Sequence, residues 1–506
     1  MRTIIFAALA LSLTIAGTPV SAQSQAQQVP KYAAKVPPSV TTPNRVKTRI
    51  GTLRFTDGVP DAATVKKAYD QLDFGRGVEA FLAGIPATSV YALCEGFREA
   101  GFPANEAMGI TESMADSRAL FLTPNSTVVY VWFCADAVKE PIVVQVPPGV
   151  LGMIDDAYFR YLTDLGLPGP DQGKGGKYLV VPTSYQGALP KDGYVVVKTP
   201  SYSNLVIIRA FVQNGDVAAV VRNIKENAAM YPLSAADSVP AQKFVNISGK
   251  QFNTIHANNF HFYEELNAVV QHEPADFLDP EVAGLFASIG IQKGKNFAPD
   301  ARMKAILVDA VATGNAASRA ILYAPRDTRL RIFPDRNWFT TFVDGSFDHI
   351  DGGSRLVDTR AMFHYYATGV TPAMTRSKPG TGSAYAIAAR DSRGDYFDGA
   401  KTYKVTLPAP IPAARFWSFT VYDNQTRSML ETDQATAGLD STFKDLKKNT
   451  DGSVTVYFSP NAPRGQEGNW VQTWPGKGWN TLFRLYGPTE SWFNKTWKPG
   501  DFELVK

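Results

Sequence analysis

The feature that most constrains the fold is a change in the spacing of apolar residues after position 126. From Thr127 onward, short runs rich in β-branched and aromatic residues alternate with clusters of Pro and Gly. Such runs are typical of β-strands, and the clusters mark turns between them. The strands predicted in this way lie at 127–135, 142–146, 178–181, 194–198 and 205–212, and again at 385–389, 403–407, 416–422, 454–458 and 482–486. The first set predicts an antiparallel sheet or sandwich, and the second a β-sandwich or jelly roll.

Helical spacing occurs before and between these two sets of strands. Apolar residues recur every three or four positions in 62–101, which predicts two or three helices, and in much of 259–320, which predicts a mainly helical stretch. One helix is expected at 216–230 and another at 355–368. The fold class that follows is α+β and rich in strands, with a helical middle between two sheet domains.

The amino-terminal residues are typical of a secretory signal peptide. A short basic start, Met1–Thr3, precedes an apolar run of about 14 residues, and Val20-Ser21-Ala22 places small residues before a cleavage site. The run is shorter than the roughly 20 residues that span a bilayer, so we expect cleavage after Ala22 rather than a membrane anchor. A polar, Pro-rich lead-in is expected at 23–43. The mature chain is predicted to be secreted or periplasmic and to have no membrane span.

The two cysteines, Cys94 and Cys134, have two interpretations. An oxidising compartment permits a disulfide between them. Alternatively, they are two separate buried thiols, since free cysteine is among the most buried residue types. The sequence leaves both open.

Composition limits the partners of the chain. Its net charge of +4, from 51 basic and 47 acidic residues, makes neither nucleic acid nor an anionic membrane an expected partner. The glycine-rich segment 169–177 departs from the P-loop and dinucleotide-binding patterns, so we expect a tight surface loop that enters the strand at 178–181. No cofactor and no metal site is predicted.

Seven motifs stand out along the chain. They are PNSTVVY (124–130), EPIVVQVPPG (140–149), GLPGPDQGKGGKYLVVP (166–182), DTRAMFHYYATGVTPAM (358–374), DSRGDYFDGAKTYKVTLP (391–408), FWSFTVYDNQTRSM (416–429) and NAPRGQEGNWVQT…RLYGPTESWFNKTW (461–497). Together they resemble the motifs of secreted bacterial proteins that join the domain-of-unknown-function families 1254 and 1214. The first three resemble family 1254, over roughly residues 65–200, and the last three resemble family 1214, over roughly 375–490.

This resemblance implies a β-sandwich-like N-terminal domain, a helical middle and a C-terminal jelly-roll β-sandwich. It implies little about chemistry, because both families are named for lacking a known function. The division expected from all these features is a signal peptide at 1–22, a disordered lead-in at 23–43, a 1254-like domain at 44–215, a mainly helical region at 216–374 and a 1214-like jelly-roll domain at 375–506.

A group of aromatic residues near the C-terminus provides the candidate ligand site. Trp470, Trp474 and Trp479 lie among Gly and Pro residues, with Arg484 in the adjoining strand and Tyr422 in another. Indole faces stack on sugar rings or flat ligands, and a guanidinium binds a carboxylate or a pair of hydroxyls. These five residues are therefore predicted to line a ligand cleft. The alternative is that they form the core of the jelly roll.

Two further sets of polar residues are candidates for chemistry. The pairs Asp155/Asp156 and Asp164/Asp171 are candidates for acid–base work on a glycosidic bond, with exposed loop acids as the alternative. His261 and Glu265 share one helical face, which would permit zinc ligation, with an ordinary polar face as the alternative.

Two function classes follow from the sequence. The first is an exported hydrolase or lyase that acts on a glycan or small polar molecule at an inter-domain cleft. The second is a non-catalytic periplasmic or envelope protein with a ligand-binding or structural role. A deep cleft with converging carboxylates, an arginine and a histidine would favour the enzyme.

Overall fold

The computed structural model describes residues 30–212 and 215–505, and the predicted signal peptide lies outside these residues. The chain divides into two compact units, one up to Tyr69 and the other from Asp70. In the first unit, a short 3-10 helix at Pro38–Val40 lies inside the predicted lead-in. It is followed by an antiparallel sheet of β1 (Arg45–Thr48), β2 (Gly51–Thr56) and β3 (Val59–Pro60).

A single long helix, α1 (Ala62–Glu99), replaces the two or three helices predicted at 62–101. Pro86 lies inside it, although proline removes a backbone donor and disfavours a helix interior. From Ala80 onward the helix has a fully buried face that includes Phe81, Ile85 and Phe97. Burial of this face in the core overrides the local helix-breaking signal, which the sequence alone could not show.

The N-terminal sheet domain is a sandwich of two sheets. One sheet has the order β14-β4-β6-β12-β8-β9 and the other the order β11-β10-β7-β13. A shared apolar core between them contains Val129, Val131 and Phe133 of β6. The strands are β4 (Met108–Ile110), β6 (Val128–Asp136), β7 (Ile142–Val146), β8 (Leu151–Asp156), β9 (Tyr161–Gly166), β10 (Gly176–Pro182), β11 (Val195–Thr199), β12 (Ser203–Phe211), β13 (Ala229–Pro232) and β14 (Phe244–Asn246).

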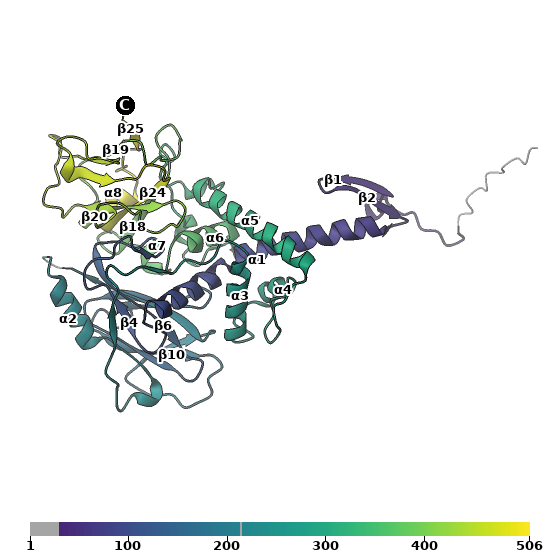
Figure 1. Cartoon of the computed structure of the whole chain (residues 1–506), viewed down its shortest axis with the longest axis horizontal. Helices are drawn as coiled ribbons and strands as arrows, with labels where there is room; N and C mark the ends of the chain where they lie inside the picture. Colours follow the sequence, from purple (N-terminus) through teal and green to yellow (C-terminus); the bar gives the residue numbers. More distant parts are fainter. Residues whose placement is uncertain (1–29, 213–214, 506) are drawn as a thin grey trace, which may run out of the picture. The chain divides into compact units, whose positions relative to one another are not determined.

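Strand β6 alternates between two cores. Tyr130, Trp132 and Cys134 point away from the sandwich and join the cluster that contains the buried residues of α1. Cys134 forms a disulfide with Cys94 of α1, so the bridge links the helix covalently to the sheet. The six-stranded sheet is thus covered on one face by the second sheet and on the other, in part, by α1, which Figure 1 shows beside β6.

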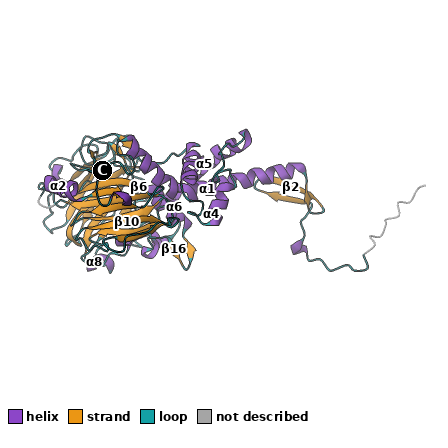
Figure 2. Cartoon of the chain, turned by 90° about the horizontal axis from the view of Figure 1, so that it is seen from below, coloured by secondary structure: helices purple, strands orange, loops and turns teal. Residues whose placement is uncertain are grey.

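The middle of the chain contains the predicted helices, but they begin and end at slightly different residues from those predicted. The helix predicted at 216–230 is α2 (Val217–Asn227), whose first turn is capped by the Asp216 carboxylate, 2.9 Å from the Ala219 N–H. It ends before Met230, because residues 229–232 pair with β7 as β13. The other helices are α3 (His261–His272), α4 (Pro280–Ala287), α5 (Ala301–Tyr323), α6 (Val357–Tyr366) and α7 (Pro372–Thr375). Figure 2 shows α4, α5 and α6 beside the strands.

Close helix packing in this region depends on glycine. A Cβ at Gly77 of α1 would lie 2.7 Å from the Cβ of Ala310 in α5, and a Cβ at Gly96 would lie 2.0 Å from the backbone oxygen of Asn253. Both distances are shorter than van der Waals contact, so glycine at these positions lets the neighbouring backbone approach α1.

The C-terminal domain consists of eight strands in two four-stranded sheets, with the orders β18-β24-β20-β21 and β23-β22-β19-β25. Phe419 of the first sheet lies 5.5 Å from Phe458 of the second, ring centroid to ring centroid, in an aromatic core. The strands are β18 (Ser383–Ala388), β19 (Tyr403–Leu407), β20 (Ala413–Asp423), β21 (Gly438–Asp440), β22 (Val454–Ser459), β23 (Trp470–Gln472), β24 (Trp479–Pro488) and β25 (Glu503–Leu504), and α8 (Glu490–Phe493) follows β24.

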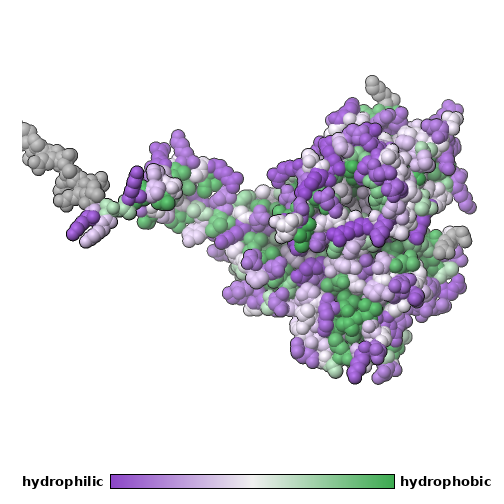
Figure 3. All heavy atoms as spheres, turned by 180° about the vertical axis from the view of Figure 1, so that it is seen from behind, coloured by the Kyte–Doolittle hydropathy of each residue, from purple (hydrophilic) through white to green (hydrophobic). Residues whose placement is uncertain are grey.

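The predicted class, α+β and rich in strands, is confirmed. The strands predicted at 416–422 and 482–486 are present as parts of β20 and β24. Four short strands outside the sandwiches form two separate two-stranded sheets: β5 (Ala119–Leu120) pairs with β15 (Phe252–Asn253), and β16 (Ile350–Asp351) pairs with β17 (Ser354–Arg355). In the space-filling view of Figure 3, hydrophilic residues cover much of the visible face, with an apolar area at the bottom.

Two helices among the described residues, α1 and α5, are long and apolar enough to cross a membrane. The most apolar 18-residue window of α1 is 67% buried inside the fold, and that of α5 is 33% buried. Buried core helices have the same length and composition as membrane spans, so these two helices are weak indications of a span. The absence of a membrane span in the mature chain stays a prediction.

Candidate functional site

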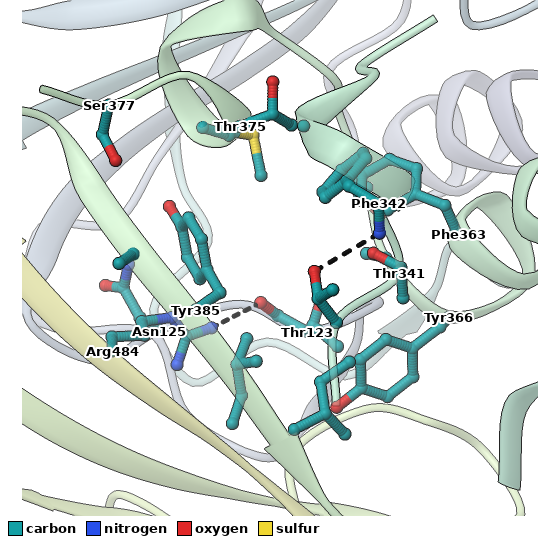
Figure 4. Close-up of a pocket in the computed structure, with 18 of the residues that line it drawn as sticks. Thr123, Asn125, Thr341, Phe342, Phe363, Tyr366, Thr375, Ser377, Tyr385 and Arg484 are labelled. Carbon is teal, nitrogen blue, oxygen red and sulfur yellow. Dashed lines mark hydrogen bonds between the residues drawn. The ribbon is translucent and has the colours of Figure 1, made fainter. Parts of the chain in front are cut away.

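A cavity of about 410 Å³ lies between the six-stranded sheet of the N-terminal sandwich and the β18-β24-β20-β21 sheet of the C-terminal sandwich. The other lining residues come from the segments 121–125, 329–332, 340–345, 363–377 and 492–495. Figure 4 draws 18 of the lining residues, and the ten that it labels come from these segments and from β18 and β24. The volume falls within the roughly 300–1,000 Å³ of pockets that hold small molecules.

The N-terminal sheet contributes one cationic and several apolar side chains to this cavity. Ile207 and Arg209 are two residues apart on β12 and therefore point to the same face, where Met153 of β8 also lines the cavity. Arg209 is the direct cross-strand neighbour of Tyr130 on β6. The buried Nε atom of Arg209 has no hydrogen-bond partner. A buried donor without a partner is rare, because its desolvation is not compensated.

The C-terminal sheet contributes a second arginine in the same way. Arg484 of β24 is the cross-strand neighbour of Tyr385 on β18, and both line the cavity. Arg484 is only 3% exposed, and its guanidinium donates to neutral oxygens. The acceptors are the Thr420 hydroxyl at 2.8 Å, the Tyr422 hydroxyl at 2.7 Å and the Thr123 carbonyl at 3.1 Å, the last of which is drawn in Figure 4.

Neither arginine is neutralised by an acid. In the part of the chain that the structure describes, no carboxylate lies within ion-pair distance of Arg209 or Arg484. Arg209 acts at longer range on Asp164. Burial raises the pKa of Asp164 above its usual value, and hydrogen bonds from Thr371 and Tyr161 and the charge of Arg209 partly oppose that rise. The cavity therefore contains two guanidinium groups whose charge is uncompensated by direct contacts.

Most other side chains around the cavity are apolar or aromatic. Phe342 and Phe363 form one wall, with ring centroids 4.7 Å apart. Tyr366 donates its hydroxyl to Asn480 at 2.7 Å, so its ring faces the cavity with no free polar atom. The Thr368 hydroxyl is buried at the cavity without a partner. The other large apolar or aromatic lining residues are Phe121, Leu122, Tyr130, Met374, Tyr385, Ile387, Leu482, Trp492 and Phe493.

The remaining charged lining residues are Arg329, Arg331, Lys495 and Asp344. The side chain of Asp344 is 80% exposed and lies 3.9 Å from Arg329, which also pairs with Asp327 and Asp351, each at 2.7 Å. Burial lowers the pKa of Lys495, whose ammonium lies 5.1 Å from the ring centre of Trp492. Five cationic side chains and one carboxylate thus line the cavity.

The structure separates the five residues that the sequence grouped into one cleft. Arg484 lines the cavity, and Tyr422, which is fully buried, supports it by accepting its hydrogen bond. The three tryptophans lie outside this lining. Trp479 is fully buried in the sandwich core, stacked on Phe397 with ring centroids 4.2 Å apart. The expectation of a tryptophan-lined cleft is corrected at this residue, because the Trp479 side chain points toward the other sheet of the sandwich.

The other two tryptophans lie at the periphery of the C-terminal sandwich. Trp470 is partly buried in β23 and donates its indole N–H to the Ser459 carbonyl at 2.9 Å. Trp474 is 43% exposed in the loop that precedes β24. The tryptophans near Arg484 in the sequence pointed to that residue, whereas nothing in the sequence pointed to Arg209. A single arginine in a strand cannot be assigned to a site until the cross-strand pairing is known.

The acidic pairs are structural and are not exposed loop acids. Asp155 and Asp156 are fully buried at the end of β8, a strand that the sequence analysis missed. Asp155 accepts from the Val370 N–H at 2.8 Å, and burial raises its pKa well above the usual range. Asp156 pairs with Arg160 at 2.5 Å. Asp171 accepts from backbone N–H groups and from the Tyr178 hydroxyl within the glycine-rich loop.

The histidines do not assemble a metal site. His261 pairs with Glu264 at 2.6 Å, whereas the Glu265 carboxylate accepts from the Ala257 N–H at 3.0 and 3.2 Å. Burial raises the pKa of Glu265 to about 7. Among the described residues, no three His, Cys, Asp or Glu side chains are grouped closely enough to hold a metal ion. Burial lowers the pKa of His256 and of His349 to about 3, so both imidazoles are neutral.

A second cavity, of about 350 Å³, lies beside the disulfide. Its polar groups are already paired: His272 lies 3.2 Å from Asp136, and Arg98 lies 2.8 Å from Glu95. The carboxylate of Glu273 accepts from the Tyr202 and Ser203 N–H groups at 2.6 and 3.2 Å. The contacts of His272 and Glu273 connect the C-terminal end of α3 to the sheet, and the inter-sheet cavity is the stronger candidate.

The fold and the cavity define a class of α+β protein in which two β-sandwiches enclose a cationic, aromatic-walled site. Two family models match this chain, both described as proteins of unknown function: DUF1254 over residues 105–232 and DUF1214 over 382–490. The predicted order of the two domains is confirmed. Arg209 lies in the first matched region and Arg484 in the second, so the cavity contains residues of both.

A solved structure shows a related fold. A crystal structure of the VPA0106 protein from Vibrio parahaemolyticus matches 86% of this chain and 100% of its own at 20% identity, with a TM-score of 0.51. A crystal structure of an uncharacterised protein from Burkholderia cenocepacia matches 87% of this chain and 96% of its own at 12% identity, with a TM-score of 0.38. No curated protein matches the chain.

Proposed function

We propose that this protein binds a small organic anion in the cavity between its two sandwiches and does not transform it. The observation that supports this proposal best is the pair of arginines, Arg209 and Arg484, that line the cavity without an acidic partner. Guanidinium groups match carboxylate geometry and form hydrogen bonds that are stronger than those between neutral groups. An anion would also give the buried Nε of Arg209 the acceptor that it lacks.

Catalysis has less support from the same residues. General acid–base hydrolysis needs at least two positioned titratable groups of suitable pKa. The lining described in the structure contains one carboxylate, that of the exposed Asp344, and neither histidine nor cysteine. A glycoside hydrolase that uses two carboxylates would need a second one. The geometry therefore favours the binding class.

The test replaces Arg209, which is only partly buried, with glutamine. We expect at least one of four probes (hexanoate, benzoate, glucuronate and inorganic phosphate) to bind the wild-type protein in isothermal titration calorimetry. Arg209→Gln should weaken that binding about tenfold or more, since a hydrogen bond to a charged group contributes about 1.5–3 kcal/mol.

Arg464→Gln is the matched control, because Arg464 is an exposed arginine outside the cavity lining. Its affinities should equal those of the wild-type protein. Failure of all four probes to bind, or equal weakening by both variants, would reject the proposal.

We further propose that the chain is exported and cleaved after Ala22. The signal-like amino-terminal residues support this proposal, as does the Cys94–Cys134 disulfide, since such bonds persist in oxidising compartments. The expected intact mass of protein recovered from outside the cytoplasm is that of a chain beginning at Gln23. A mass that includes Met1 would contradict it.

A further inference from the structure

We infer that the anion is an amphipathic monocarboxylate, with its carboxylate between Arg209 and Arg484 and its apolar body against the aromatic wall. This inference rests on the proposed function and names the class of ligand. Two independent features of the cavity lead to it: the convergence of the two arginines, and the distribution of apolar side chains around the rest of the lining.

The position of the carboxylate follows from two cross-strand pairs. Each sheet contributes one arginine beside one tyrosine, Arg209 beside Tyr130 and Arg484 beside Tyr385. Arg484 donates to the Thr123 carbonyl at 3.1 Å, and the N–H of Asn125, two residues later, donates to the Tyr130 hydroxyl at 3.2 Å. The segment 123–125 therefore connects Arg484 to Tyr130, the cross-strand neighbour of Arg209, and both guanidinium groups line the same cavity.

The supporting contacts leave this position available to a ligand. The Tyr130 hydroxyl accepts the Asn125 N–H at 3.2 Å, and Arg484 is held by Thr420, Tyr422 and Thr123. These contacts orient Arg484 through neutral acceptors and leave its charge uncompensated. One carboxylate between the two arginines would compensate both guanidinium groups, since its two oxygens accept from two directions.

The apolar body follows from the carbon-rich part of the lining. Phe342, Phe363, Met374 and Ile387 present carbon to the cavity, and the Tyr366 hydroxyl is already bonded to Asn480. A carboxylate or a sugar placed against these four side chains would be desolvated without gaining a hydrogen bond from them. An alkyl or aryl body would instead bury apolar surface against them.

The size of the cavity supports a body of moderate length. At about 410 Å³ the cavity is near the lower end of pockets that enclose small ligands. A buried methylene contributes enough transfer free energy to raise affinity about fourfold. Affinity should therefore rise with chain length until the apolar wall is covered.

The experiment measures affinities for hexanoate, octanoate, octanamide and the dicarboxylate suberate by titration calorimetry. We expect octanoate to bind about tenfold more tightly than hexanoate, because it adds two methylenes. Octanamide, which lacks the charge, and suberate, which has a second one, should each bind at least tenfold more weakly than octanoate. Equal binding of octanoate and suberate, or of octanoate and octanamide, would overturn the inference.

Two variants test the carboxylate end and the apolar end of the ligand separately. Arg209→Gln should weaken hexanoate and octanoate by the same factor, whereas Met374→Ser should reduce the advantage of octanoate over hexanoate. If glucuronate or phosphate binds in an Arg209-dependent way and octanoate does not, the assignment of an amphipathic monocarboxylate is wrong and the proposed function stands. If no anion binds, the proposed function itself fails. The wild-type titrations decide these cases even if a variant fails to fold.

Discussion

Replacing Trp479 with alanine is expected to lower the free energy of unfolding by about 3–5 kcal/mol, the range for removing a buried indole from a core. Trp479 is fully buried, and its ring stacks on Phe397 at 4.2 Å and on Phe458 at 5.3 Å between centroids. These neighbours belong to a densely packed aromatic core that cannot collapse fully into the space left behind. Urea unfolding followed by tryptophan fluorescence and circular dichroism measures the change.

Trp474→Ala provides the comparison for this prediction. The side chain of Trp474 is 43% exposed in a loop, so its loss should change the free energy of unfolding by no more than about 0.5 kcal/mol. The two variants remove the same side chain from positions only five residues apart in the sequence. Equal stabilities for the two variants would contradict the placement of Trp479 in the core.

Removing the disulfide should have an effect of similar size. In the double variant Cys94→Ser, Cys134→Ser the unfolded chain regains the freedom of a loop in which the cysteines are 40 residues apart. Loop-closure entropy for this length corresponds to about 4 kcal/mol of lost stability. The bridge also links α1 to β6 beneath the six-stranded sheet, so its loss should loosen the attachment of the helix.

The measurement compares urea unfolding of the wild-type protein and the double variant, each with and without a reductant. The reductant should destabilise the wild-type protein toward the level of the variant and leave the variant unchanged. Thiol titration of the denatured, unreduced protein should find no free cysteine. Two free thiols in protein recovered from outside the cytoplasm would show that the bridge does not form.

Much of the local structure was predictable because it depends on short-range patterns. The strand at 142–146 was predicted with its observed bounds, since alternation of β-branched residues between turn signals is a local property. Strands β8 and β9 were missed, because buried aspartates interrupt their apolar pattern. Those aspartates are satisfied by partners distant in sequence, such as Val370 for Asp155 and Thr371 for Asp164. No local pattern records such a contact.

The site was predictable only in part for the same reason. Arg484 and Tyr422 were singled out by their aromatic surroundings, and the structure brings them into contact at 2.7 Å. Trp479 was assigned to the same cleft because it follows a segment rich in Gly and Pro that contains two other tryptophans, next to the strand of Arg484. Residues an odd number of positions apart on one strand point to opposite faces, so β24 directs Trp479 into the sandwich and Arg484 toward the cavity.

The sequence by itself determined the class of fold, the order of the two domains and the positions of ten strands and of most helices, because periodicity, turn residues and family motifs are properties of contiguous segments. Tertiary structure alone decided that α1 continues through Pro86, that Cys94 meets Cys134, and that Arg209 and Arg484 line one cavity. Each of these outcomes depends on the burial or proximity of residues far apart in the chain. Their free energies arise only when the sheets and helices pack together, so no local segment contains them.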